Sequence, residues 1–556
     1  MQKMLRFQSK LIYLINASIL LFHSQIINAQ NFIVILTDDQ DQQINGLEPI
    51  KNALNYVFGN TNSIQFINSY TVSPLCCPSR AAILTGRYPH NHGTKNNTRN
   101  GNCNGEDFIK NSEPKNFLKI LKDQRSYTTF YSGKYLNQYW EAERIPPGID
   151  HWYGLLGNSR YYGYQMSHNG VKKSYGHDYE KDYLPNVIKN QLFDFLEEYT
   201  FRKNDKNFIA VASLPSCHSP WNSEPKYSDR FKNMGPPDFL PNYNFPNDQK
   251  HWLVRQAPIP MSNASVEYLT NAFISRWRTL LTVGDLLKET LDKIQQLGIS
   301  KDTYIIFTSD NGYHLGSFGM PLDKRQNFET DLRVPLFFRR PDDLQKQSLI
   351  KTNKFQNFEQ SSLSSWNIQK TVVSNIDLAP TILDLAKVPR TAMKSIDGRS
   401  YSHLIQNQRL QNNPFTEEKR RIFIEYYGEA IRNKPSPENC PGKNLVGLAQ
   451  CFPDCVCDDS WNNTYTCAID NFTSGKINKI CQFEDDEKFL EIYNVFNDPF
   501  ELDNLAETVN GGKSDESQNL KAVIHKFFSN FKNCKEDKCR NYNEHVDNND
   551  ILSNNL

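Results

Sequence analysis

The chain has almost no excess of charge of either sign. Its 556 residues include 63 Lys and Arg against 62 Asp and Glu, a formal charge of +1, so there is no strong field to attract nucleic acid or an acidic membrane. There is no internal repeat, and beyond residue 30 no apolar run is long enough to cross a bilayer. These absences argue against a nucleic-acid-binding or multi-spanning membrane protein. The length instead predicts one large globular domain and a smaller one.

The first 30 residues have the pattern of a secretory signal peptide. Three basic residues precede a short apolar run over residues 11–22, and residues 27–29 then offer a small-residue cleavage site. A membrane anchor is the alternative, and Asn16 argues against it because it interrupts a run already short for a bilayer span. We therefore expect residues 1–30 to be removed, and the mature protein to be lysosomal or secreted without membrane attachment.

Secretion changes how the 12 cysteines are interpreted. In an oxidising compartment cysteines are most simply paired in disulfides. Eight lie after residue 439: Cys440, Cys451, Cys455, Cys457, Cys467, Cys481, Cys534 and Cys539. A zinc site at Cys451, Cys455, Cys457 and Cys467 is the second interpretation. Four glycosylation sequons agree with the secretory route, at Asn96, Asn263, Asn462 and Asn471.

Short apolar runs that end in polar residues recur through the first two-thirds of the chain. They predict buried strands of a parallel sheet over residues 32–36, 128–131, 208–212, 304–307 and 334–338. Apolar residues at helical spacing lie between or after them, over residues 268–297 and 377–386. This alternation is typical of a layered α/β domain, in which ligands bind beyond the carboxyl ends of the strands.

A second region begins where this pattern loosens, near residues 390–420. It contains a predicted strand at 421–425, the cysteine cluster, an apolar segment at 489–496 and a predicted helix at 520–531. We therefore place a main domain at residues 31–415 and a cysteine-rich α+β subdomain at 416–540. Residues 541–556 are polar and Asn-rich and are predicted to be a disordered tail.

Four side chains with oxygen ligands follow two of the predicted strands. Asp38 and Asp39 come after the first strand, and Asp310 and Asn311 come after the run at 304–307. Hard cations such as Ca²⁺ or Mg²⁺ bind such ligands, whereas zinc or copper would need more His or Cys. Either pair alone would fit a helix cap, but two pairs at strand ends favour a metal site.

Positive side chains suited to a tetrahedral anion beside this metal are Arg80, Lys134, His218 and Lys324. Any one of them would ordinarily be a solvated surface charge, but Lys134 follows the strand at 128–131 and so lies at a sheet end. The nucleophile beside such a metal is expected to be Ser or Thr, because a thiolate does not suit Ca²⁺ or Mg²⁺. The chemistry of the residues alone therefore leaves the adjacent Cys76 and Cys77 unexplained.

The segment around these cysteines resembles a family signature. The run CCPSRAAILTG at residues 76–86 is similar to the sulfatase motif C-x-P-S-R-x-x-x-L-T-G, in which the first Cys is oxidised to formylglycine in the endoplasmic reticulum. The resemblance implies that Cys76 is the modified residue and that a formylglycine-generating enzyme is a partner during maturation. Cys77 fills the variable position and is either buried or paired with Cys103.

The resemblance extends from about residue 31 to residue 540. Further similar segments are GKYLN, HSPW, DNGYH, DKR and YNVFNDP, which begin at residues 133, 218, 310, 323 and 493. Several resemble one branch, lysosomal N-acetylglucosamine-6-sulfatase and related extracellular glucosamine-6-sulfatases. The resemblance implies an alkaline-phosphatase-like fold, with a large, mostly parallel sheet flanked by helices and a smaller C-terminal domain with an antiparallel sheet. The branch implies removal of 6-O-sulfate from N-acetylglucosamine in glycans such as heparan or keratan sulfate.

The family also implies a role for each candidate residue. The ligands of the cation, usually Ca²⁺, would be Asp38, Asp39, Asp310, Asn311 and position 76. Arg80 would steady the hydrated formylglycine. Lys134, His218 and Lys324 would hold sulfate oxygens, and His218 or Lys324 would protonate the leaving oxygen.

The implied reaction uses both hydroxyls of the hydrated aldehyde. One attacks sulfur and expels the sugar alcohol. The other then loses a proton, so that sulfate leaves as the aldehyde re-forms. A helix is expected to begin after Pro78, over residues 79–84, where its N-terminus would favour an anion.

Two departures from the family pattern affect the site. Many sulfatases have, at the position of Leu136, a His that takes the proton in the release step. His92, Asn137 or His314 could replace it, and the two His are also candidate substrate ligands; ordinary loop hydrogen bonding is the alternative for both. Cys217 stands where Pro is commoner, and we expect it to be a free thiol.

Other functions remain open at this point. A phosphate-ester hydrolase of the same superfamily would use an unmodified Ser or Thr, which the complete Cys-x-Pro-Ser-Arg motif disfavours. A secreted glycan-binding protein derived from a sulfatase would have lost a ligand or the Cys, and none is missing. A sulfatase of another sugar specificity stays possible, and the sequence does not decide the oligomeric state.

Overall fold

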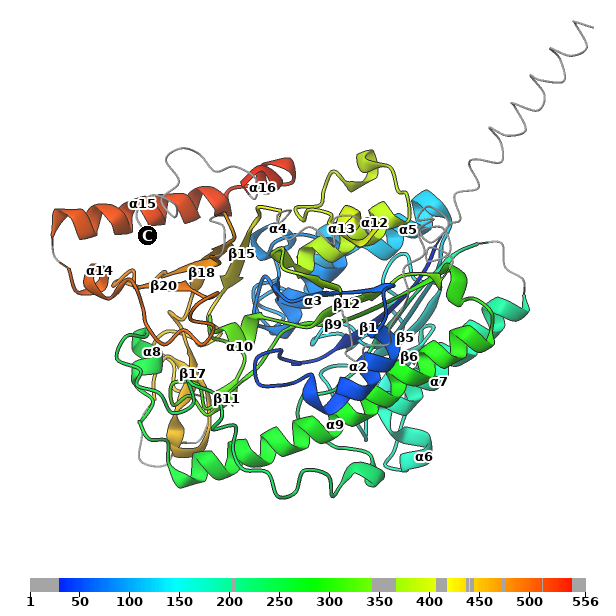
Figure 1. Cartoon of the computed structure of the whole chain (residues 1–556), viewed down its shortest axis with the longest axis horizontal. Helices are drawn as coiled ribbons and strands as arrows, with labels where there is room; N and C mark the ends of the chain where they lie inside the picture. The colour runs from blue at the N-terminus through cyan, green and yellow to red at the C-terminus, as the bar shows by residue number, and fades with distance from the viewer. Residues whose placement is uncertain are drawn as a thin grey trace, which may run out of the picture.

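An α/β body with a second, smaller sheet at one side makes up the computed structural model of the chain (Figure 1). It describes residues 30–202, 206–342, 367–406, 418–436, 440, 445–472, 476–512 and 514–542. The expected signal peptide, apart from residue 30, and the proposed boundary at residue 415 lie outside the described residues. Among those described, no helix combines the length and apolarity of a membrane span.

Ten strands form the central sheet, in the order β13-β2-β12-β9-β1-β8-β4-β5-β6-β7. β1 (Asn31–Thr37) lies between β9 (Thr303–Ser309) and β8 (Phe208–Ser213), and the three are parallel and buried along their whole length. β4 (Thr128–Lys134) and β5 (His151–Leu155) extend the parallel set beyond β8. Strands covered on both faces are apolar throughout, which is why the short apolar runs predicted them correctly.

The flanks of the sheet depart from the parallel prediction. β12 (Leu336–Arg339), predicted as a parallel strand over residues 334–338, runs antiparallel to both β9 and β2 (Ser63–Phe66). The chain reaches β12 from β9 without the long crossover helix that a parallel return needs, so it comes back in the opposite direction. The remaining strands are the antiparallel β6 (Gln165–His168) and β7 (Val171–Ser174), and β13 (Asn367–Gln369), parallel to β2.

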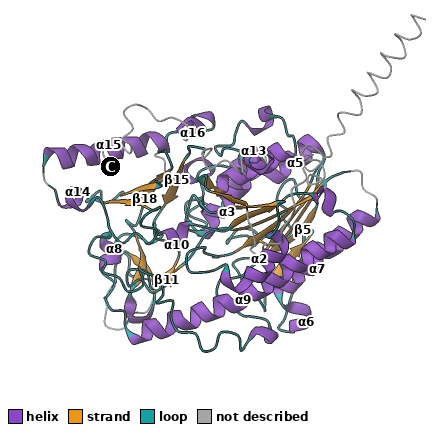
Figure 2. Ribbon diagram, in the orientation of Figure 1, coloured by secondary structure: helices purple, strands orange, loops and turns teal. Residues whose placement is uncertain are grey.

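Two apolar cores lie on the two faces of this sheet, as Figure 2 shows by the helices on both sides. Ile33 and Ile35 of β1 face one core, while Phe32, Val34 and Leu36 face the other, because side chains alternate along a strand. The first core includes α2 (Lys51–Phe58), α7 (Leu184–Phe201) and α9 (Asn263–Gln296). The second includes α3 (Cys76–Thr85), α5 (Phe117–Arg125) and α12 (Leu378–Leu385). The helices predicted at 268–297 and 377–386 are thus confirmed.

The second sheet is antiparallel throughout. Its strands are β15 (Arg421–Tyr426), β18 (Tyr465–Asp470), β19 (Asn478–Phe483) and β20 (Leu490–Asn494). α15 (Asp515–Lys532) packs on it through Ile524, Phe528 and Phe531. The helix predicted at 520–531 is confirmed, and it begins earlier because the Ser514 side chain accepts the backbone N–H of Ser517 and caps it.

The shorter elements connect these layers. The two-stranded pairs are β3 (Ser69–Tyr70) with β14 (Val373–Ser374), β10 (His314–Leu315) with β11 (Leu322–Asp323), and β16 (Leu448–Cys451) with β17 (Cys457–Ser460). The short helices are α4 (Pro89–His92), α6 (Tyr179–Asp182), α8 (Trp252–Arg255), α10 (Glu329–Leu332), α13 (Ser402–Gln406), α14 (Glu507–Gly511) and α16 (Asp537–Tyr542). α16 includes the first two residues of the predicted tail, and the rest of that tail lies outside the described residues.

Five disulfides account for ten of the cysteines: Cys77–Cys103, Cys440–Cys455, Cys451–Cys457, Cys467–Cys481 and Cys534–Cys539. The prediction that the eight C-terminal cysteines form disulfides is confirmed. The four cysteines of the alternative zinc site are all paired, so none of them offers the thiolate that zinc would need. Cys76 and Cys217 are free and buried, as predicted for Cys217.

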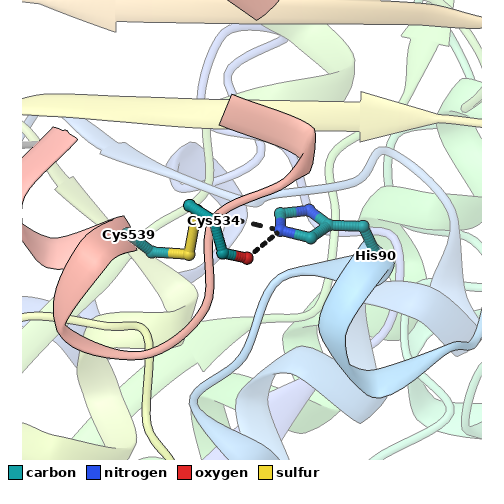
Figure 3. Close-up of side chains that lie close together, drawn as sticks. All are labelled: His90, Cys534 and Cys539. Atoms are coloured by element: carbon teal, nitrogen blue, oxygen red, sulfur yellow. Dashed lines mark hydrogen bonds between the residues drawn. A yellow bond between two sulfur atoms is a disulfide. The ribbon is translucent and has the colours of Figure 1, made fainter. Parts of the chain in front are cut away.

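The segment that follows the second sheet contacts the N-terminal half of the chain at His90 (Figure 3). His90 Nδ1 bonds the buried carboxylate of Glu425 in β15, and its Nε2 lies 3.1 Å from the carbonyl oxygen of Cys534. The Cys534–Cys539 disulfide closes the turn between α15 and α16 at that point. Asn91 donates to the same carbonyl at 3.1 Å. We call these contacts of His90 and Asn91 with Glu425 and Cys534 the clasp. It holds the segment just after α3 against the C-terminal sheet.

Candidate active site

The predicted metal ligands meet at the carboxyl end of the central strands. β1 and β9 end in register, so the residues that follow them leave the sheet side by side. One carboxylate oxygen from each of Asp38, Asp39 and Asp310 lies within 4.8 Å of the others. The side-chain amide of Asn311 donates to Asp39 Oδ1 at 2.8 Å. The structure therefore brings together two pairs of adjacent residues that lie about 270 positions apart in the sequence.

Cys76 is the first residue of α3 and lies at this cluster. Its Sγ is 3.8 Å from both Asp38 Oδ1 and Asp39 Oδ1. The prediction that the helix begins after Pro78 is wrong, because proline is tolerated in a first helical turn, where its missing N–H would have no partner. All ten residues of α3 are buried.

Three cations surround the carboxylates, each from a different element. Arg80 in α3 donates from Nε to Asp310 Oδ2 at 2.7 Å, and its Nη2 lies 3.6 Å from Asp38 Oδ1. Lys134, the last residue of β4, donates to Asp38 Oδ2 at 2.7 Å. Lys324 follows β11, and its Nζ lies 2.5 Å from Asp39 Oδ2. The predicted anion-binding side chains are thus part of the same site as the predicted metal ligands.

The charge balance differs from one carboxylate to the next. Burial alone would raise the pKa of Asp38, but Lys134 and Arg80 hold it well below its usual value. Burial raises the pKa of Asp310 to about 7, with Asp38 opposing the effect of Arg80. Burial also raises the pKa of the Cys76 thiol to about 12, so the thiolate is disfavoured. An unmodified Cys76 is therefore a poor nucleophile at neutral pH.

A divalent cation fits this set of donors. Three carboxylates in one buried site repel one another, and a cation between them would relieve that repulsion. Asn311 Oδ1 is buried and has no hydrogen-bond partner among the described residues, so it is available as a fourth oxygen ligand. An all-oxygen set matches Ca²⁺ or Mg²⁺ better than zinc.

His218 lies on the side of the cluster that faces the cavity. Its Nδ1 is 2.7 Å from the carbonyl oxygen of Ser219, which can only accept, so Nδ1 carries the proton. Its Nε2 lies 3.9 Å from Asp39 Oδ2. Burial, reinforced by Lys324, lowers the pKa of His218 to about 4. The ring is therefore neutral in this arrangement near pH 7.

The two other candidate histidines lie away from the cavity. His92 is buried, its Nδ1 accepts the backbone N–H of Thr94 at 3.1 Å, and burial lowers its pKa to about 3. His314 is buried between Asp331 and Asp458. Burial would lower the pKa of His314, but these two carboxylates raise it to about 10. The structure does not bring either ring to the cluster.

A cavity of about 700 Å³ opens onto the cluster. Its lining residues include Asp39, His218 and Lys324, together with Asn137, one of the candidates to replace the missing histidine. Leu136 is wholly buried in the core. Aromatic and polar side chains from distant parts of the sequence complete the walls, among them Trp140, Arg160, Tyr268, Tyr313, Glu429 and Phe452. A cavity of this size is typical of a small-molecule site.

Sequence reasoning missed Ser159. This residue follows β5, and its Oγ donates to Asp38 Oδ2 at 2.5 Å, beside the bond from Lys134. A single Ser in a loop has no spacing that marks it. The available signal is its position after a strand of the parallel set, because the carboxyl ends of those strands form the site.

Comparison with known proteins agrees with the geometry. A family model described as Sulfatase matches residues 30–388. N-acetylglucosamine-6-sulfatases of Capra hircus and Homo sapiens are each 40% identical over 486 residues, which cover 86% of this chain and 80% and 81% of those proteins. A solved structure of a protein in complex with its substrate, D-glucosamine-2-N,6-O-disulfate, has a TM-score of 0.60 and 21% identity over 91% of this chain and 98% of the other. The alkaline-phosphatase-like fold is confirmed, and the chain belongs to the sulfatase family.

Proposed function

We propose that this sulfatase removes the 6-O-sulfate of N-acetylglucosamine residues in sulfated glycans such as heparan or keratan sulfate. The observation that carries the proposal is the site around Cys76, where the sulfur lies 3.8 Å from two carboxylates that are paired with Lys134 and Lys324. The sugar specificity is supported by the names of the 40% identical relatives. The structural neighbour described with a 6-O-sulfated glucosamine supports it further.

Two groups complete the site in this proposal. Asp38, Asp39, Asp310 and Asn311 would hold Ca²⁺ or Mg²⁺, which would polarise the sulfate ester and stabilise negative charge. Cys76 would be converted to formylglycine by a formylglycine-generating enzyme, and the hydrated aldehyde would supply the attacking hydroxyl and a second hydroxyl that allows sulfate to leave. The raised pKa of the Cys76 thiol supports this replacement, because the unmodified side chain is a weak nucleophile.

The side chains of the protein would divide the remaining work. Lys134, Lys324 and His218 surround the space beside residue 76 and would bind sulfate oxygens, where charge increases during transfer. Arg80 bonds Asp310 and approaches Asp38, so it would fix two of the ligands and steady residue 76. Lys324 Nζ lies 2.5 Å from Asp39 Oδ2 and carries the protons needed to protonate the leaving sugar oxygen. His218 Nε2, 3.9 Å from the same oxygen, would donate to sulfate or to the leaving oxygen only after the bound sulfate anion has favoured protonation of its ring.

The proposed location is the secretory pathway, ending in the lysosome or outside the cell. The five disulfides of the described chain support it, because such bonds persist in oxidising compartments. The division of the chain into a catalytic domain at 31–415 and a cysteine-rich subdomain at 416–540 remains part of the proposal. The cavity lining draws on both segments.

Sulfate release from a panel of defined monosaccharides tests the proposal. The panel contains the 3-O-, 4-O- and 6-O-sulfates of N-acetylglucosamine and the 6-phosphate, each assayed at acid and neutral pH. We expect release from the 6-O-sulfate, and none from a Cys76→Ala variant purified in the same way. Sulfate release from the 3-O- or 4-O-sulfate alone would contradict the sugar assignment. Release of inorganic phosphate from the 6-phosphate faster than sulfate from the 6-O-sulfate would indicate a phosphate-ester hydrolase. Mass analysis of the peptide containing residue 76 checks the conversion of the thiol to an aldehyde.

A further inference from the structure

Arg160 differs from every other positive residue on the cavity wall. Lys324 is paired with Asp39, and Arg325 is paired with Asp323 and Glu429. Arg160 lines the same cavity and is exposed. Within the described part of the chain, its guanidinium makes no hydrogen bond or ion pair. The cavity wall thus carries one cationic side chain that is not paired with any carboxylate of the described chain.

The backbone at Arg160 is nevertheless firmly held on both sides. The preceding Ser159 is buried and bonds Asp38 of the metal-ligand cluster. The following Tyr161 is wholly buried, and its hydroxyl donates to the carbonyl oxygens of Pro215 and His218 at 3.2 and 3.1 Å. The backbone of Arg160 is therefore held in a fixed position, next in sequence to Ser159, which bonds the metal-ligand cluster.

The neighbouring part of the wall is suited to a sugar. The Trp140 indole lies directly over Gly157, where a side-chain carbon would come within 2.2 Å of the ring. The same indole donates to Gln138 Oε1 at 3.3 Å and is 55% exposed. Trp140 and Arg160 both belong to the cavity wall, which therefore offers a flat apolar surface and a guanidinium unpaired within the described residues. Such a wall matches a sugar ring that carries an anionic group.

We propose that Arg160 binds a second anionic group of the substrate, in addition to the 6-O-sulfate that is cleaved. The inference rests on the proposed function and concerns its choice of polymer. A guanidinium pairs with sulfate or carboxylate through two parallel hydrogen bonds. Two sources carry this chemistry: an N-sulfate on the same glucosamine, or the carboxylate of an adjacent uronic acid. Both occur in heparan-type chains, whereas a keratan-type neighbour, galactose, offers no such carboxylate.

Four substrates separate these sources: N-acetylglucosamine-6-sulfate, glucosamine-2-N,6-O-disulfate, and two disaccharides in which N-acetylglucosamine-6-sulfate is linked to a uronic acid or to galactose. The variants are Arg160→Gln, which removes the charge, and Arg160→Lys, which keeps it. Arg125→Gln is the matched control, because it removes an exposed charge from α5, whose residues do not line the cavity. The thermal unfolding midpoint of each variant reports on folding.

We expect Arg160→Gln to lower kcat/KM by about 10- to 100-fold, mainly through KM, on at least one substrate with a second anion, as loss of a charged hydrogen bond predicts. The singly anionic substrates should change by less than about 2-fold, Arg160→Lys should recover part of the loss, and Arg125→Gln should lose nothing. Loss on the disulfate identifies the N-sulfate as the source, and loss on the uronic acid disaccharide identifies the carboxylate.

An equal loss on all four substrates, or no loss on any of them, would overturn the role of Arg160 and leave the proposed function standing. If the wild-type protein released 6-O-sulfate from none of the four substrates, the proposed function would itself be refuted and this inference with it.

Discussion

Replacing Ser159 by Ala tests whether the carboxylate cluster is a cation site that depends on its surroundings. The substitution removes the 2.5 Å bond from Ser159 Oγ to Asp38 Oδ2 and leaves the bond from Lys134. Loss of one group that orients a ligand typically weakens metal binding by about 10- to 100-fold. At a Ca²⁺ concentration of about 100 times the wild-type Kd, bound metal stabilises the folded state by about 2.7 kcal/mol. The variant should gain only about 0.4 to 1.4 kcal/mol under the same conditions.

Two measurements follow this change independently. Unfolding of the chelated and Ca²⁺-loaded proteins gives the stabilisation by metal, and sulfate release from N-acetylglucosamine-6-sulfate over a Ca²⁺ titration gives the activity. Ser167→Ala is the matched control, because Ser167 is also a buried serine with a 2.5 Å bond, but to the backbone carbonyl of Ala142 in another part of the sheet. Equal metal stabilisation in the Ser159→Ala and Ser167→Ala variants would refute the reasoning.

Three further predictions concern the nucleophile, the anion-binding lysine and the clasp. Cys76→Ser should stop turnover and leave a sulfo group on residue 76, detectable by intact mass, because serine lacks the second hydroxyl; an unmodified mass after incubation with substrate would argue against covalent transfer. Lys324→Gln should lower kcat by about 100- to 1,000-fold, as loss of one stabilising donor does, and an unchanged kcat would remove Lys324 from the reaction. Burial would lower the pKa of His90, but Glu425 raises it, while burial would raise the pKa of Glu425, but His90 lowers it. The stabilisation due to His90 is thus complete below about pH 6.5 and is lost as pH rises through its folded-state pKa, and that due to Glu425 is lost as pH falls below about 4.5. His90→Gln should therefore lower the free energy of unfolding by about 3 kcal/mol near pH 5.5 and by clearly less near pH 9. Denaturant unfolding at the two pH values measures this loss, and an equal loss at both would contradict the prediction.

The parts of the site that could be predicted from the sequence are those carried by strands or by a long motif. Asp38 and Asp310 could be placed together because each follows a fully apolar run, and such runs form neighbouring parallel strands whose ends share one edge. Cys76 and Arg80 could be placed because both are fixed positions of one signature, four residues apart, although the start of the helix that carries them was predicted three residues too late. Lys134 could be placed because it ends a strand of the same set.

The parts that could not be predicted depend on contacts between distant loops. Ser159 and Arg160 belong to a loop whose path depends on Tyr161 and Asp38, and no local pattern records those contacts. The direction of β12 depends on the absence of a long crossover helix, which an apolar run cannot show. His314 is followed, 17 and 144 positions later, by the two aspartates that hold it. The motif alone therefore made His314 a candidate site residue, and only its pairing with Asp331 and Asp458 shows that the ring is held away from the site.

The complete burial of α3 sets an order of events in biosynthesis. Once the sheet, the helices beside it and the Cys77–Cys103 disulfide have enclosed this segment, another protein can no longer grasp the chain at residue 76. Any enzymatic change to that thiol must therefore be finished while the newly made polypeptide is still open. A molecule that folds before Cys76 is modified would be stable and correctly disulfide-bonded but inactive. The modification of Cys76 must therefore be faster than the folding of the segment around it.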